Sequence, residues 1–482
     1  MHLEEVILSS SSSSSASGSL SFFNLQSGIS LANFKHVNAG RHSTAFTPSR
    51  DGQGGFILSA QSDKSILNIH SFQREQIALK IVLPEKLTCL ALDPNAEFCA
   101  GGSAHGRIYL WEVASGILFN SWDAHYRQVN VLKFTHDGAA LISGSDDSGV
   151  SVWTMSSLLD DDLQNEAPTP YCMLSDHTLP ITDIVCGVGL FPTCRVLTSS
   201  MDNCAKIWDL STKSLLTTFQ FAHPVESVVW DKTERMFFAA LTDGTLHQIN
   251  LFRRRDGQPE AIGGAGLSDI IRTNEEESGS RPKRVISVGA SVASMSISLT
   301  GSTLLVGTTA GTINIYDIAS HQLLRSISPL AQKGLAITYL ATMIKPVDLV
   351  GHVSPQLNLN VGTMGGGDPK DVFPIKPFAT FQRIRDAKAR EAHEVLMALR
   401  STEEASSLTY SKEELAEDHA FFMASGTSSQ QSDKALLKNK VDTLEAEVAM
   451  LKEQLGKAKG VNDLMWEKLV QNTLVNRTDG QS

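Results

Sequence analysis

A histidine, a serine, an aspartate and a tryptophan recur at matching spacing in two neighbouring parts of the chain. The first set is His125, Ser145, Asp147 and Trp153. Serine, histidine and aspartate are the groups of a hydrolytic triad, in which the histidine takes the proton of the attacking serine hydroxyl. Nucleophilic hydrolysis is therefore the chemistry that these residue types raise first.

The second set, His177, Ser200, Asp202 and Trp208, favours a structural reading. A catalytic triad would not be duplicated at such an interval. In a blade of a β-propeller, the aspartate lies in a turn and bonds the histidine, which bonds the serine, which reaches the indole N–H. Buried polar groups must satisfy one another in this way. We interpret both sets as structural tetrads, and we expect no enzymatic activity.

The elements that position these residues form a long-period repeat. Strand-like runs end in an aromatic or apolar residue at steps of about 40 residues or more, which is typical of four-stranded propeller blades. We therefore predict an all-β fold, a seven-bladed WD-repeat propeller spanning residues 1–345. The seven ends are Phe23, Ile69, Trp111, Trp153, Trp208, Ile249 and Tyr316.

The chain is expected to start inside a blade, because too few residues precede the first end for four strands. The unassigned strand-like run 336–343 is predicted to return and complete that first blade. Pairing both ends of the chain in one sheet would remove the open edges of the ring.

The tetrad pattern is incomplete in several blades. Asp63 and Asp243 hold the place of the turn aspartate, whereas His105, Ala310 and Ser17 stand there in three other blades. We expect the latter blades to depend mainly on apolar packing.

Breaks in the repeat divide the rest of the chain. Loop insertions are predicted near 158–170 and 253–284, the second of them disordered, because both are rich in charge, Gly or Pro. We predict an extended linker over 346–380, a helical segment over 381–424 and a coiled-coil dimerisation helix over 433–470.

The last helix carries apolar residues at alternating four- and three-residue steps. Valine at a and leucine at d favours a parallel two-stranded coil, and an asparagine at an a position fixes its register. We predict a homodimer, the alternative being a single helix packed on the propeller. The seam residues are Leu437, Val441, Leu444, Val448, Leu451, Leu455 and Asn462.

Composition narrows the function classes. A net charge of −11 and a pI near 5.7 argue against a general nucleic-acid-binding surface. The six cysteines include no C-x-x-C pair, so we expect a reducing compartment and no metal site or cofactor. The most apolar stretch, 335–344, is about half the length of a membrane span. We expect a soluble intracellular protein.

A basic run leaves one alternative open. Phosphoinositide-binding propellers carry Phe-Arg-Arg-Gly at a place comparable to Phe252, and here Arg253, Arg254 and Arg255 follow it. The other readings are a solvated basic loop or half of a nuclear import signal together with 281–284, since short basic runs have low specificity.

The order of parts is more distinctive than the propeller alone. The N-terminal Glu-Glu-Val-Ile-Leu-Ser at 4–9, the strand Gly-Ser-Leu-Ser-Phe-Phe-Asn-Leu at 18–25, the linker ending Pro-Ile-Lys-Pro-Phe at 374–378 and the helical tail occur together. In this the chain resembles the WD-repeat subunit of the eukaryotic pre-ribosomal RNA-processing complex, the WD repeat-containing protein 18 family, and most closely its fungal members.

This resemblance implies a non-enzymatic scaffold of the nucleus, in nucleolus and nucleoplasm, that supports large-subunit maturation and removal of the second internal transcribed spacer. The partners it implies are a large helical-repeat protein, a smaller subunit, the AAA-type ATPase midasin and the pre-ribosomal particle. The alternatives are a phosphoinositide-binding propeller acting at membranes and a signalling or ubiquitin-ligase adaptor, because docking surfaces leave little trace in one sequence.

Overall fold

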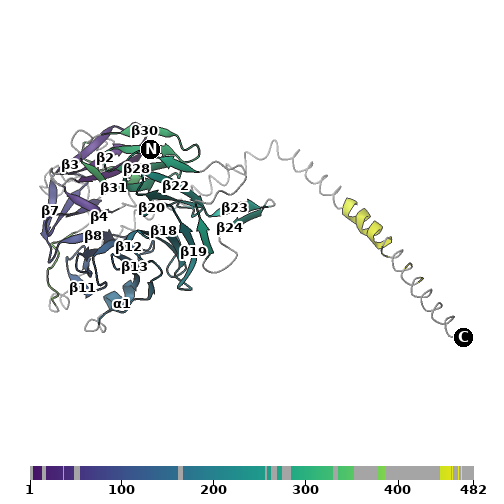
Figure 1. Cartoon of the computed structure of the whole chain (residues 1–482), viewed down its shortest axis with the longest axis horizontal. Helices are drawn as coiled ribbons and strands as arrows, with labels where there is room; N and C mark the ends of the chain where they lie inside the picture. The colour runs from purple at the N-terminus through teal and green to yellow at the C-terminus, as the bar shows by residue number, and fades with distance from the viewer. Residues whose placement is uncertain are drawn as a thin grey trace, which may run out of the picture. The chain divides into compact units, whose positions relative to one another are not determined.

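The computed structural model describes residues 4–12, 18–35, 37–47, 55–160, 167–255, 258–261, 269–273, 284–328, 335–351, 378–386, 446–457, 459, 465 and 468. The chain divides into two compact units, Met1–Met397 and Ala398–Ser482. Among its described residues, the first unit contains seven sheets of at least four strands each, together with one short hairpin. Figure 1 shows these sheets as the blades of a propeller, which confirms the predicted fold class for this unit.

Each of blades 2 to 5 runs from its innermost to its outer strands in chain order. Blade 2 comprises β4 (Ala39–Phe46), β5 (Phe56–Gln61), β6 (Ile66–Ser71) and β7 (Ile77–Val82), and blade 3 comprises β8 (Leu87–Leu92), β9 (Phe98–Ser103), β10 (Arg107–Glu112) and β11 (Leu118–Asp123). Blade 4 comprises β12 (Val129–Phe134), β13 (Ala140–Ser145), β14 (Val150–Thr154) and β15 (Cys172–Leu174), and blade 5 comprises β16 (Ile181–Cys186), β17 (Arg195–Ser200), β18 (Cys204–Asp209) and β19 (Ser214–Gln220).

Two further blades complete the series before the chain returns to its start. Blade 6 comprises β20 (Val225–Trp230), β21 (Met236–Leu241), β22 (Thr245–Asn250) and β26 (Val285–Ser287), and blade 7 comprises β27 (Val292–Ile297), β28 (Thr303–Thr308), β29 (Ile313–Asp317) and β30 (Leu323–Ile327).

Blade 1 joins the two ends of the propeller sequence. Its strands lie in the order β3 (Ser30–Lys35), β2 (Ser19–Asn24), β1 (Glu5–Ser12) and β31 (Ala336–Ile344). The returning strand pairs antiparallel with β1 along its length, from Glu5 opposite Ile344 to Ser12 opposite Ala336. The predicted closure of the ring is confirmed, and it leaves no unpaired inner strand at the join.

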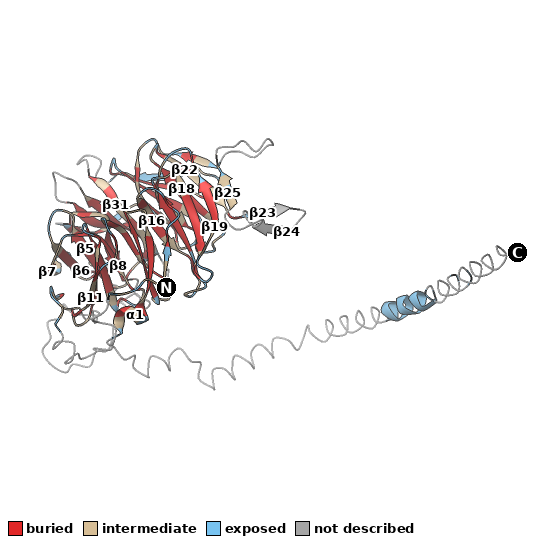
Figure 2. Cartoon of the chain, turned by 60° about the horizontal axis from the view of Figure 1, so that its bottom comes forward, coloured by how far each residue is buried: buried red, intermediate tan, exposed pale blue. Residues whose placement is uncertain are grey.

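Apolar side chains lie between neighbouring blades, and most strand residues are buried (Figure 2). Between blades 3 and 4, Trp122 packs edge-to-face on Trp153 with ring centroids 5.4 Å apart. Such aromatic pairs add a stabilising contact beyond the area they bury. Because each cluster draws residues from two adjacent blades, the blades stabilise one another.

The expected loop at 158–170 begins with ordered structure. A short helix, α1 (Met155–Leu159), follows β14, and Leu158 is fully buried in the cluster between blades 3 and 4. The Asn120 amide donates a hydrogen bond to the Leu158 carbonyl at 3.3 Å. The predicted start of the loop at residue 158 is therefore wrong. The buried Leu158 side chain extends the apolar core past the end of β14.

The prediction of a disordered loop over 253–284 is wrong for its described parts. A hairpin of β23 (Phe252–Arg255) and β24 (Gln258–Ala261) begins the insertion. A later strand, β25 (Asp269–Arg272), pairs parallel with β19, the outermost strand of blade 5. Outer strands carry unpaired backbone N–H and C=O groups, and this pairing satisfies part of that edge.

The segment after the propeller also differs from expectation. Residues 378–386 lie within the predicted linker and helical segment, yet they are neither helical nor free of the propeller: Phe381 belongs to the core cluster of blades 2 and 3. The predicted helix is therefore wrong for 381–386, because Phe381 packs on a blade instead of lining a helix. The remainder of the helical segment, 387–424, lies outside the described residues.

Candidate docking face

His125 and Asp147 in blade 4 form one end of a buried polar network. The Nδ1 atom of His125 lies 3.1 Å from Oδ2 of Asp147, and its Nε2 atom lies 2.8 Å from Oγ of Ser143. The indole N–H of Trp153 donates to the same hydroxyl at 3.0 Å. Although burial by itself raises the pKa of the Asp147 carboxyl, hydrogen bonds from His125 and the Gly149 amide lower it to about 2.

Blade 5 repeats the network with a threonine. His177 bonds Asp202 and the Thr198 hydroxyl, each at 2.8 Å, and Trp208 donates to that hydroxyl at 2.9 Å. Ser200 does not take the place of the hydroxyl between histidine and tryptophan: its hydroxyl donates to the Leu179 carbonyl at 2.8 Å and accepts from the Asp202 amide at 3.2 Å.

The choice of Ser145 and Ser200 as tetrad members is thus wrong. Ser143 and Ser145 share one face of β13, because strand side chains alternate. Only Ser143 is a diagonal neighbour of Trp153, however, since it stands opposite Ser151 while the tryptophan stands opposite Leu141. Side chains reach diagonal neighbours and not residues farther along a strand. Ser145 instead donates to the Arg127 carbonyl at 3.3 Å.

Burial removes these tetrads from hydrolytic chemistry. Ser143 and Thr198 are fully buried, and each accepts a hydrogen bond from an indole. A nucleophile must reach a substrate atom at near-contact distance, which a hydroxyl enclosed in this way does not. Within the described part of the chain, no group of three or more His, Cys, Asp or Glu side chains could hold a metal ion.

The tetrads position apolar side chains on the surface of the propeller. Each turn aspartate also accepts a hydrogen bond from the residue after the histidine: Asp147 from the Tyr126 amide at 3.1 Å and Asp202 from the Thr178 amide at 3.2 Å. The Tyr126 side chain is 98% exposed. Leu179, the residue that follows Thr178, is 48% exposed. The network fixes the backbone, and the side chains project outward.

We define the docking rim as Tyr126, Leu179 and Met201, three exposed apolar residues on the face of blades 4 and 5 that carries the tetrad turns. Met201 is 40% exposed and lines a cavity of about 520 Å³ at the mouth of the central channel. Exposed apolar side chains beside a hollow are typical of protein-binding surfaces. The sequence patterns missed this rim, because lone apolar residues in turns carry no periodicity.

An irregular part of β4 places two side chains near strands of blades across the ring. The register changes between Ala39 and Thr44, and His42 takes a positive φ of 55°. The Arg41 guanidinium donates to the carbonyl of Glu226 on β20, and burial lowers the pKa of His42 to about 4. Neutral His42 lies 3.9 Å from Asp183. The Arg41 hydrogen bond therefore links blade 2 to blade 6 across the ring.

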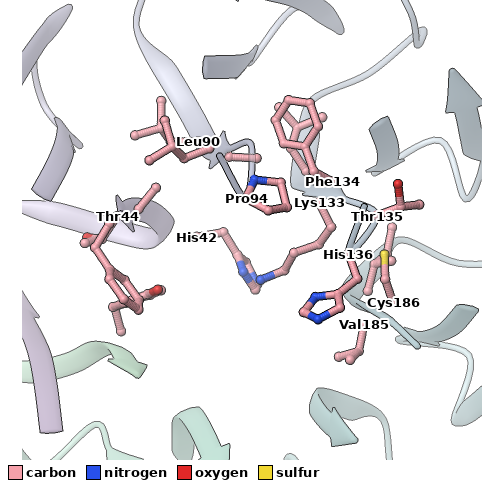
Figure 3. Close-up of a pocket in the computed structure, with 17 residues that line it drawn as sticks. His42, Thr44, Leu90, Pro94, Lys133, Phe134, Thr135, His136, Val185 and Cys186 are labelled. Atoms are coloured by element: carbon pink, nitrogen blue, oxygen red, sulfur yellow. The ribbon is translucent and has the colours of Figure 1, made fainter. Parts of the chain in front are cut away.

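His42 also lines a second cavity, of about 320 Å³, at the other end of the inner strands (Figure 3). Lys133 and His136 point into the same space from blade 4. The channel therefore contains basic side chains. The sequence pattern did not indicate that they lie together, because they come from separate blades.

A family model described as WD domain, G-beta repeat matches residues 116–154 and 168–209, which contain the two complete tetrads. Pre-rRNA-processing protein IPI3 of Mycosarcoma maydis is 34% identical over 91% of this chain and 89% of its own length. Human WD repeat-containing protein 18 is 32% identical over 68% of this chain and 70% of its own. The chain belongs to this IPI3 and WD repeat-containing protein 18 family.

In this member of the family, the backbone of the basic run forms part of a β-hairpin. Arg253, Arg254 and Arg255 lie in β23 and pair with Glu260, Pro259 and Gln258 of β24. Their side chains lie outside the described residues, so lipid binding and nuclear import through them stay predictions. None of the described helices is both long and apolar enough to cross a membrane.

The tail of this family member is described over one helix, residues 446–457. Three residues of the predicted seam lie in it: Val448, Leu451 and Leu455 are 48%, 62% and 72% exposed. Leu437, Val441, Leu444 and Asn462 lie outside the described residues. The exposed seam residues lie on one side of the helix, since steps of three and four residues bring side chains onto one face.

Proposed function

We propose that this protein is a non-enzymatic scaffold in nuclear maturation of the large ribosomal subunit. The observation that carries the proposal is the match along 91% of the chain to a relative named for pre-rRNA processing. The docking rim supports it, because a scaffold needs exposed apolar contacts held on a rigid support. The tetrads supply that support through buried hydrogen bonds.

The proposal extends to partners and place. The chain acts in the nucleus, in nucleolus and nucleoplasm, within a pre-rRNA-processing complex that includes a large helical-repeat protein and a smaller subunit. It supports removal of the second internal transcribed spacer and recruitment of midasin to the pre-ribosomal particle. The exposed seam of the tail supports a homodimer, which would double the number of docking rims and raise effective concentration at a two-sided target.

Affinity purification of the tagged full chain, with mass spectrometry and probing for precursor RNA, tests this function. We expect the complex subunits, midasin and pre-rRNA that retains the second spacer to co-purify, and depletion of the protein to increase that precursor. Recovery of ubiquitin-ligase subunits or signalling proteins without pre-rRNA would replace the proposal with an adaptor function.

A rim variant makes the same experiment specific to the proposed surface. Tyr126→Asp with Met201→Asp adds two charges to the docking rim, and recovery of at least one complex subunit should fall. Leu323→Asp is the matched control, because Leu323 is 52% exposed on the outermost strand of blade 7. Equal recovery of the complex subunits with both variants would show that the docking rim is not a binding surface. The assignment to pre-rRNA processing would still be tested by probing for precursor RNA.

Liposome flotation tests the membrane alternative. We expect no flotation with phosphoinositide-containing vesicles. Flotation that requires the lipid and is lost on Arg253→Ala with Arg254→Ala would favour the lipid-binding function over the scaffold.

A further inference from the structure

The tryptophan of blade 3 lacks the hydroxyl partner that its counterparts in blades 4 and 5 have. In those blades the hydroxyl lies ten positions before the tryptophan. Gly101 stands at this place before Trp111. A β-carbon there would approach the Leu87 side chain to 2.6 Å, so the space is already filled. The turn aspartate is replaced by His105 as well. The buried Trp111 N–H therefore needs an acceptor from elsewhere.

That acceptor comes from far along the chain. The Trp111 indole donates to the Gln382 carbonyl at 2.9 Å, across 271 positions in sequence. Two backbone bonds secure the same segment to the turn between β10 and β11: the Ala379 amide donates to Val113 at 3.0 Å and the Gln382 amide to Gly116 at 2.8 Å. An extended segment that uses its backbone in this way resembles a strand added to an exposed edge.

Two aromatic side chains anchor the segment. Phe381 is 4% exposed and stacks on Trp111, with centroids 5.2 Å apart and planes at 15°. Trp111 stacks in turn on Tyr109 at 5.3 Å. Phe378 packs on Phe56 of blade 2 with centroids 5.7 Å apart. Aromatic rings enclosed in this way are typical anchors of a binding surface.

The fit is close at the backbone too. Gly116 has a positive φ of 75°, and a β-carbon at this position would collide with the Thr380 carbonyl oxygen. A glycine is therefore required both by the turn and by the approach of the segment. Past the second anchor, the Ile384 side chain is 80% exposed.

We propose that Phe56, Tyr109, Trp111, Val113 and Gly116 form a peptide-binding groove, the Trp111 groove, whose ligand is the chain's own segment 378–382. Its recognition pattern is a phenylalanine, two intervening residues, a second phenylalanine and a following backbone carbonyl. Blade 3 is thereby completed by a segment from outside the repeat. Docking also fixes the point on the propeller from which the chain continues toward its tail.

Hydrogen exchange of the full-length protein, read by mass spectrometry, tests the groove. In the wild type, the peptides that report on the Ala379 and Gln382 amides should be protected. Phe381→Ala should speed their exchange by about tenfold or more, because the anchor that holds both bonds is lost. Ile384→Ala is the matched control, since it removes an exposed apolar side chain from the same segment, and it should leave this exchange unchanged.

Exchange in β10 separates release of the segment from unfolding of the blade. Protection of β10 should persist in Phe381→Ala. Should this variant unfold, Phe378→Ala, which removes the half-buried anchor, serves instead, and the same amides should exchange faster with β10 still protected. Wild-type amides that exchange at the rate of an unstructured segment, or equal effects of Phe381→Ala and Ile384→Ala, would overturn the proposal.

A synthetic peptide of residues 374–386 provides the second arm. Added to full-length Phe381→Ala protein, it should bind saturably, as followed by fluorescence anisotropy of a labelled peptide. The same peptide with alanine at both phenylalanine positions should bind at least about tenfold more weakly, because each anchor fills an apolar site. Equal binding of the two peptides would show that the groove does not recognise the two phenylalanines.

Discussion

Asp147 and His70 illustrate two opposite states of buried polar groups in this propeller. Asp147 has partners on several sides, including His125 and two backbone amides. His70 is fully buried, and neither of its ring nitrogens has a hydrogen-bond partner among the described residues. The first group stabilises the fold in its charged form, whereas the second is tolerated only in its neutral form.

Asp147→Ala should lower the free energy of unfolding by about 1–3 kcal/mol, because His125 loses its partner inside the blade. Urea unfolding at neutral pH measures the change. Asp243→Ala should have a smaller effect, since Asp243 holds the same turn place but its histidine, His223, is 54% exposed. Loss of partner binding at unchanged stability would instead make Asp147 a contact residue.

Because His70 is buried, we predict that the stability of the fold decreases in acid. Burial lowers its pKa to about 4 from the ordinary 6.5. Between these values the unfolded chain binds a proton that the folded chain does not, so stability falls as pH falls from about 6.5 to 4. His70→Leu should flatten this part of the profile, by on the order of 3 kcal/mol at pH 4. Urea unfolding at several pH values checks it, and an unchanged profile would contradict the pKa assignment.

At the scale of elements, one strand and one extended segment that the repeat period did not indicate lie at the outer parts of blades. β25 pairs with the outermost strand of blade 5, and segment 378–382 bonds the outer turn of blade 3. Both add backbone hydrogen bonds where a blade would otherwise present unpaired groups. Elements outside the repeat therefore contribute to the blades that the repeat builds.

The tail helix is the element with the sharpest prediction. Leu451→Asp with Leu455→Asp should convert a dimer into a monomer in light scattering, because facing like charges in an apolar seam are strongly disfavoured. Met450→Asp is the matched control: Met450 is 56% exposed in the same helix but lies outside the seam. An unchanged mass of the seam variant would refute the coiled coil. Unchanged melting of the propeller in both variants would show that its fold is independent of the tail.

For the whole molecule, closure of the ring through blade 1 links the two ends of the propeller sequence. β31 pairs with β1, and its residues Ile337 and Leu340 share a core cluster with strands of blade 7. Blades that pack on both neighbours have no free end at which unfolding can begin. We therefore expect the propeller to unfold in one cooperative transition.

Ile337→Asp tests this closure. Ile337 is fully buried, so a charge there should lower the free energy of unfolding by about 3 kcal/mol or more. Chemical unfolding should still show one transition, moved to lower denaturant, while Leu323→Asp on the exposed edge of blade 7 should move it little. A separate early transition in Ile337→Asp would mean that blade 1 opens without the rest.

The fold and part of the tetrads were predictable from local pattern alone. Strands of period two, turns at fixed offsets and tryptophans such as Trp153 and Trp208 specify a blade, because its contacts lie within about 40 residues of sequence. Ring closure followed from the one strand-like run left without a blade. The histidine and aspartate of each tetrad were correctly chosen by spacing, since the turn places them in reach.

Tertiary structure decided the remainder. Whether Ser143 or Ser145 accepts the Trp153 indole depends on cross-strand register, which two serines on one face of a strand do not distinguish. The partner of Trp111 lies 271 positions away, and the basic channel residues come from different blades. Such contacts depend on which distant segments come together in space, and local periodicity does not indicate this.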